Sequence, residues 1–122
     1  MAWIAVAVGG ALGSMARHGV NVIANRFFNT PIPYATAIVN VAGCFVIGTL
    51  AGLIASGRLH MSTTMRTFVF VGILGGFTTF SSFGLDTLTL TRGGAQAMAL
   101  GNVAGQVSVG LLCVYLGYRL AL

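Results

Sequence analysis

Charged side chains are almost absent from this sequence, and their absence limits what it can fold into. The 122 residues include six arginines and one aspartate, with no lysine or glutamate. A soluble domain carries charge on about a quarter of its residues, whereas only 6% are charged here and 57% are hydrophobic. The arginines stand singly between apolar runs, as residues at the ends of membrane helices do. The composition therefore predicts a protein embedded in a lipid bilayer that binds no nucleic acid.

Four apolar segments are each long enough to cross a bilayer, which takes about 20 helical residues. We expect spans over about Ala2–Ala24, Tyr34–Ser56, Thr67–Thr91 and Ala95–Leu120. The first lacks the basic start of a cleaved signal peptide, so we expect it to be retained. No segment is left for a soluble domain. The sequence predicts one four-helix transmembrane domain over residues 1–122.

Each predicted span contains a Gly-x-x-x-Gly pair. The pairs are Gly9/Gly13, Gly48/Gly52, Gly72/Gly76 and Gly101/Gly105. Glycines one helical turn apart allow two helix backbones to approach closely in lipid. We interpret most of these glycines as packing contacts, with the exception of Gly75–Gly76, because a polar segment follows it.

The segment Gly75–Phe83 interrupts the apolar pattern of the third span. It combines two adjacent glycines with four hydroxyl side chains and three phenylalanines. An unsatisfied polar group in hydrocarbon costs several kcal/mol, so irregular polar backbone is expected only where protein buries it or a wet path adjoins it. On a helix, Phe77, Phe80 and Phe83 would form one packing stripe, but the electropositive ring edges could instead attract a small anion. This segment is the first candidate for a functional site.

Other polar residues also lie at membrane depth, where they are costly and point to function. Asn40 offers either an interhelical hydrogen bond or a donor facing a pore. Asn102 and Gln106 are one helical turn apart, so they share a face that either bonds another helix or forms a polar track. Asp86, the only acid, is expected to have a structural role near Arg92.

Three motifs resemble those of the Fluc (CrcB) family of fluoride channels. Gly75–Asp86 resembles the third-helix signature of glycines, hydroxyls and paired phenylalanines, with Asp86 in place of the commoner glutamate. Ala37–Gly43 resembles the second-helix motif, in which Val-Asn precedes small residues. Gly9–Gly13 followed by Arg17 resembles the first-helix motif. Together with the four-span layout, the resemblance covers nearly the whole chain.

The resemblance implies an all-α membrane protein with four transmembrane helices per protomer and a broken third helix. It further implies an antiparallel, dual-topology homodimer with two fluoride pores along its interface. A sodium ion would sit at the break, held by the backbone carbonyls of Gly75 and Thr78 from both chains. The pore residues that it implies are Asn40, Thr79, Phe80, Ser82, Phe83, Asn102 and Gln106.

We interpret the chain as a passive channel through which fluoride leaves a microbial cytoplasm across the cell inner membrane. No nucleotide-binding loop or nucleophile–base pair is present, so we expect no enzyme. Two other classes stay open. A small proton-coupled drug exporter would need a membrane-embedded glutamate, which this sequence lacks. A non-transporting membrane assembly subunit would explain the glycines but not the polar segment.

The positive charges are nearly balanced between the two sides of the membrane. With four crossings, one side holds Arg58, Arg66 and Arg119. The other side holds Arg26 and Arg92, joined by Arg17 if that side chain reaches the interface instead of neutralising backbone carbonyls. Orientation follows the excess of Lys and Arg in short loops, so we expect insertion in both directions.

Overall fold

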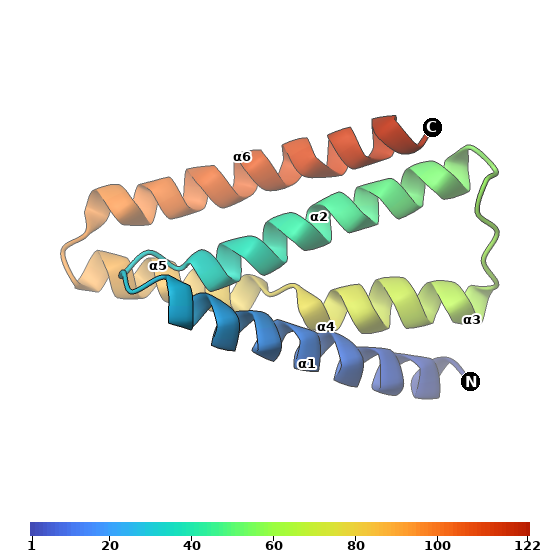
Figure 1. Cartoon of the computed structure of the whole chain (residues 1–122), viewed down its shortest axis with the longest axis horizontal. Helices are drawn as coiled ribbons and strands as arrows, with labels where there is room; N and C mark the ends of the chain where they lie inside the picture. The colour runs from blue at the N-terminus through green and yellow to red at the C-terminus, as the bar shows by residue number, and fades with distance from the viewer.

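The computed structural model describes all 122 residues, and its regular structure is entirely helical (Figure 1). The elements are α1 (Ala2–Phe27), α2 (Tyr34–Ala55), α3 (Thr63–Arg66), the π-helix η1 (Thr67–Leu74), α4 (Gly75–Phe77), α5 (Phe80–Arg92) and α6 (Gln96–Ala121). Segments α3 to α5 follow one another along a single interrupted rod. The rods run back and forth, and both termini lie at the same end of the molecule (Figure 1).

Three of these rods are long and apolar enough to cross a membrane. They are Tyr34–Ala55, Thr63–Arg92 and Gln96–Ala121. This confirms the prediction of an all-helical membrane protein. Helix α1 has the same 26-residue length as α6, but it does not reach their hydropathy, because Arg17 and His18 interrupt its apolar run.

Glycines bring the helices together in two pairs. A Cβ atom on Gly72 of η1 would lie 2.8 Å from the Gly9 Cα of α1. A Cβ on Gly48 of α2 would overlap the Val114 carbonyl of α6. Backbones this close leave no room for larger side chains, so the packing interpretation is confirmed for the pairs of α1 and α2 and for Gly72. Gly76, which the sequence analysis set apart, also packs closely, because a Cβ there would lie 2.7 Å from the Gly10 carbonyl oxygen. The fourth pair differs, because Cβ atoms on Gly101 and Gly105 would meet nothing within 4 Å.

Gly13→Ala is expected to destabilise the protein, because the added methyl group would overlap the Ile73 carbonyl. Overpacking of this kind costs about 1–3 kcal/mol, and rigid backbone on the far side favours the upper end. Gly19→Ala on the same helix is the matched control, since nothing lies within 4 Å of its Cβ position. Thermal unfolding in detergent checks this, and equal midpoints for the two variants would contradict the packing argument.

Candidate functional site

The third rod breaks inside the polar segment that the sequence singled out. Thr78 (φ −82°, ψ 160°) and Thr79 (φ −153°, ψ 118°) are extended, and α5 begins at Phe80. Thr79 Oγ1 caps α5 by accepting a hydrogen bond from the Ser82 N–H at 3.2 Å. The prediction that the three phenylalanines form one stripe is therefore wrong, because the break separates Phe77 in α4 from Phe80 and Phe83 in α5.

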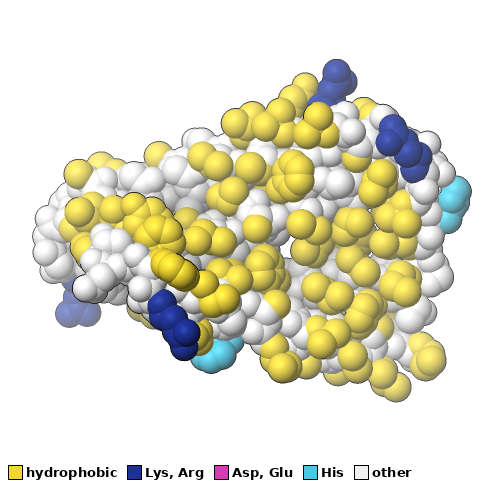
Figure 2. Space-filling model, in the orientation of Figure 1, with side chains coloured by type: hydrophobic (Ala, Val, Ile, Leu, Met, Phe, Trp, Pro, Cys, Tyr) yellow, Lys and Arg dark blue, Asp and Glu magenta, His cyan; other side chains and the backbone are white.

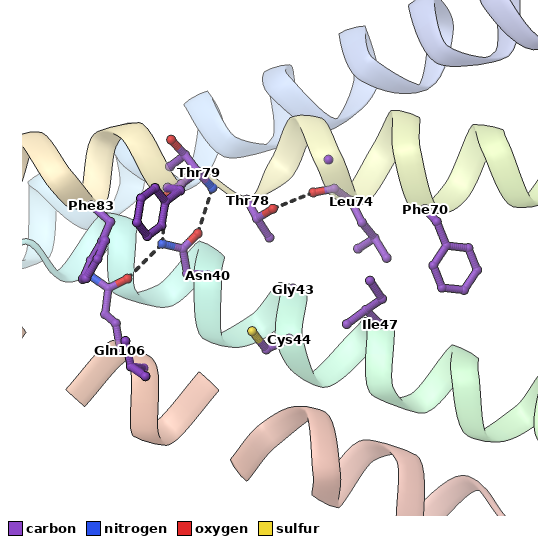
Figure 3. Close-up of a pocket in the computed structure, with 13 residues that line it drawn as sticks. Asn40, Gly43, Cys44, Ile47, Phe70, Leu74, Thr78, Thr79, Phe83 and Gln106 are labelled. Carbon is purple, nitrogen blue, oxygen red and sulfur yellow. Dashed lines mark hydrogen bonds between the residues drawn. The ribbon is translucent and has the colours of Figure 1, made fainter. Parts of the chain in front are cut away.

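Asn40 on α2 supplies the hydrogen-bond partners that Thr79 needs at the break. The Thr79 N–H donates to Asn40 Oδ1 at 2.8 Å, and Asn40 Nδ2 donates to the Thr79 carbonyl at 3.0 Å. Figure 3 shows the Asn40 side chain pointing from α2 toward Thr79. One amide side chain thus satisfies both main-chain groups of Thr79. Without it, each buried group would cost several kcal/mol in a membrane.

These contacts release two carbonyl groups from helical bonding. In an uninterrupted helix the Thr79 N–H would donate to Gly75 O, but it donates to Asn40. The Ser82 N–H would likewise donate to Thr78 O, but it donates to Thr79 Oγ1. Arg17 Nη1 of α1 reaches Thr78 O at 3.4 Å. The carbonyl oxygens of Gly75 and Thr78 therefore lie at the break with lone pairs that accept no helical hydrogen bond.

The polar residues of α6 join the same network. Asn40 Nδ2 donates to Gln106 Oε1 at 2.8 Å, and Gln106 Nε2 donates to Asn102 Oδ1 at 2.8 Å. Asn102 Nδ2 then donates to Thr87 Oγ1 at 3.0 Å. The predicted shared face of Asn102 and Gln106 is confirmed, and this face bonds both α2 and α5.

The two phenylalanines of α5 differ in their surroundings. Their ring centroids lie 5.5 Å apart with the planes at 45°. Phe83 is 9% exposed, whereas Phe80 is 82% exposed on the protomer. Packing within one protomer therefore buries the Phe83 side chain but leaves the Phe80 side chain uncovered.

One cavity of about 430 Å³ borders most of the predicted site residues (Figure 3). Those that line it are Asn40, Gly75, Thr78, Thr79, Phe80, Phe83 and Gln106. Two others lie elsewhere. Ser82 lines a more polar cavity with Asp86, and Asn102 lines one between α2 and α6.

Sequence reasoning missed one participant, Thr36. Thr36 Oγ1 donates to Asp86 Oδ2 at 2.8 Å. The sequence had suggested Arg92 as the neighbour of Asp86, but the structure gives this acid a hydrogen-bond partner on α2. Thr36 could have been noticed, because it is one helical turn before Asn40 and shares its face. Arg17 was assigned to an interface or to backbone carbonyls, and the structure places it at the Thr78 carbonyl.

Comparison with known proteins gives consistent matches over almost the whole length. The family model described as CrcB-like protein, Camphor Resistance (CrcB), matches residues 4–118. The chain is 50% identical over 117 residues to "Fluoride-specific ion channel FluC" of Paracoccus denitrificans, covering 94% of this chain and 90% of the relative. It is 44% identical over 117 residues to the protein of that name in Opitutus terrae, covering 95% and 89%. It is also 42% identical over 118 residues to one in Thermus thermophilus, covering 97% and 93%.

Proposed function

Because this chain belongs to the CrcB-like protein family, we propose that it is a fluoride-selective ion channel that lets fluoride leave the cytoplasm. The observation that carries the proposal is the helix break, where amide and hydroxyl side chains and two phenylalanines border one cavity. Relatives named as fluoride channels match the chain along nearly all of its length. The cavity lining includes no lysine or arginine, which would hold anions tightly and without selectivity.

Conduction needs only a path and a driving force. A negative-inside potential of 100 mV contributes about 2.3 kcal/mol per charge toward expelling an anion across the inner membrane. The phenylalanine ring edges are electropositive, and the hydroxyls and amides can donate hydrogen bonds to a dehydrated anion. No bond of the anion is made or broken, so the protein is not an enzyme.

The working unit is an antiparallel homodimer in which each protomer has four crossings, α1 included. Two features of the protomer support a missing partner. Phe80 is 82% exposed although it belongs to the pore signature. Cβ atoms on Gly101 and Gly105 of α6 would meet nothing within 4 Å. Hydrophobic side chains are spread over the whole face shown in Figure 2, and the few arginines lie near its margins, which suits contact with lipid or a second copy.

A sodium ion at the break is part of the proposal, with the Gly75 and Thr78 carbonyls of each chain as ligands. Hard cations take oxygen ligands, and both carbonyls have lost their helical donors to other acceptors. Arg17 occupies one direction at Thr78 O, and a carbonyl oxygen has two lone pairs. When bound, the ion supplies a fixed positive charge that favours anions over cations.

Purified protein in liposomes is expected to release fluoride under an applied potential and to release chloride far more slowly. Fluoride and chloride electrodes measure the two rates on the same vesicles, and protein-free vesicles are the control. Equal rates for both anions would overturn fluoride selectivity. Proton movement driven by a drug gradient, without fluoride release, would instead indicate an exporter, and no flux of any kind would favour an assembly subunit.

A further inference from the structure

Gln106 is the only residue through which the polar network of α6 reaches the helix break. Its Oε1 accepts from Asn40 Nδ2 at 2.8 Å, and Asn40 in turn pairs with both main-chain groups of Thr79. In Figure 3 the Gln106 side chain extends from α6 to Asn40, and Gln106 and Phe83 line the same cavity. The other α6 amide in this network, Asn102, bonds Thr87 of α5, well beyond the break.

The direction of the hydrogen bonds in this network is fixed at both ends. At one end the Thr79 N–H can only donate, so Asn40 must present its oxygen there. At the other end Thr87 Oγ1 donates to the Phe83 carbonyl, which can only accept. Each amide between them must therefore accept from one neighbour and donate to the next. Turning a single amide around would place two donors or two acceptors face to face, so the Gln106 oxygen faces Asn40 by necessity.

This arrangement leaves Asn40 with no free hydrogen-bond donor. Its Nδ2 carries two hydrogens, and these go to the Thr79 carbonyl at 3.0 Å and to Gln106 Oε1 at 2.8 Å. The Thr79 carbonyl belongs to the main chain at the break and cannot move away without unfolding it. The Gln106 oxygen sits on a flexible side chain, so it is the acceptor that an anion can displace.

We propose that Gln106 is a specificity-determining residue, because its amide oxygen occupies the hydrogen-bond position on Asn40 that a permeating anion must take. This inference rests on the fluoride channel function proposed above. Fluoride is compact and accepts hydrogen bonds strongly, so it can replace an amide oxygen at 2.8 Å. Chloride is larger and a weaker acceptor, so it gains less on Asn40 than Gln106 loses. Gln106 keeps its bond to Asn102 as a pivot while it is displaced.

Gln106→Met tests the proposal, since methionine has similar length but offers no comparable acceptor to Asn40. The chloride-to-fluoride flux ratio in liposomes is expected to rise about tenfold, which corresponds to about 1.4 kcal/mol of lost discrimination. Gln96→Met is the matched control, because Gln96 is on the same helix and bonds only the Thr91 carbonyl, at 3.4 Å. If Gln106 merely stiffened Asn40, both fluxes would fall together, and an unchanged ratio would overturn the proposal.

Gln106→Glu provides a second test that does not depend on the folding of the methionine variant. The carboxylate still accepts from Asn40, and a charged acceptor holds the N–H more strongly than an amide does. It can no longer donate to Asn102 Oδ1, so the bond to Asn102 in its present direction is lost. Fluoride flux is therefore expected to fall about tenfold or more, and flux within about twofold of the unmodified protein would overturn the proposal. A lack of fluoride flux in the unmodified protein would instead contradict the channel function itself, so the two failures are distinguishable.

Discussion

Asn40→Leu is expected to remove nearly all folded, conducting protein. The substitution leaves the N–H and the carbonyl of Thr79 without their partners, and each unsatisfied buried group costs about 1–3 kcal/mol. Leucine also deprives Gln106 of its donor. The recovery of protein by size-exclusion chromatography and the fluoride flux of what is recovered measure the effect.

Asn102→Leu is the matched control for that experiment. It makes the same chemical change at the far end of the same network, but Thr79 keeps both hydrogen bonds to Asn40. Thr87 Oγ1 also keeps its acceptor, the Phe83 carbonyl. We expect Asn102→Leu to be recovered as folded protein. Equal recovery of both variants would contradict a structural role of Asn40 at the break.

The polar segment could be predicted from the sequence, because hydroxyls and paired glycines are costly at membrane depth unless something satisfies them. What satisfies them could not be predicted. Asn40 and Thr79 are 39 residues apart, and only the packing of α2 against the break brings them together. From the residues alone, an interhelical hydrogen bond and a pore role for Asn40 were equally open. The structure shows the interhelical hydrogen bonds, and the pore role stays a prediction.

The two errors in the sequence prediction have the same physical origin. The phenylalanine stripe assumed a continuous helix, but two extended residues change the rotational phase between Phe77 and Phe80. Asp86 was paired with Arg92 because they are close in sequence, yet its partner Thr36 is 50 residues away. Reasoning from spacing holds only while the helix is uninterrupted and the partners are local.

Adding three lysines to the turn after Thr91 is expected to force the protein into one orientation and abolish fluoride export. Both termini lie at the end of the molecule opposite that turn (Figure 1). In the unmodified chain the arginines near the two sides are almost equal in number, so the insertion machinery has little excess of charge to read. We therefore expect the unmodified chain to insert both ways in roughly equal amounts.

An antiparallel dimer needs both orientations in the same membrane, so a chain fixed in one orientation cannot complete it. Three lysines added between Arg58 and Arg66 should fix the opposite orientation, and that variant alone should also fail to export fluoride. Co-expression of the two variants should restore export, which separates lost topology from lost folding. A reporter fused to Leu122 measures orientation directly. If it is found on one side only in the unmodified protein, dual topology is wrong, and the exposed Phe80 then faces lipid, a parallel copy or another partner.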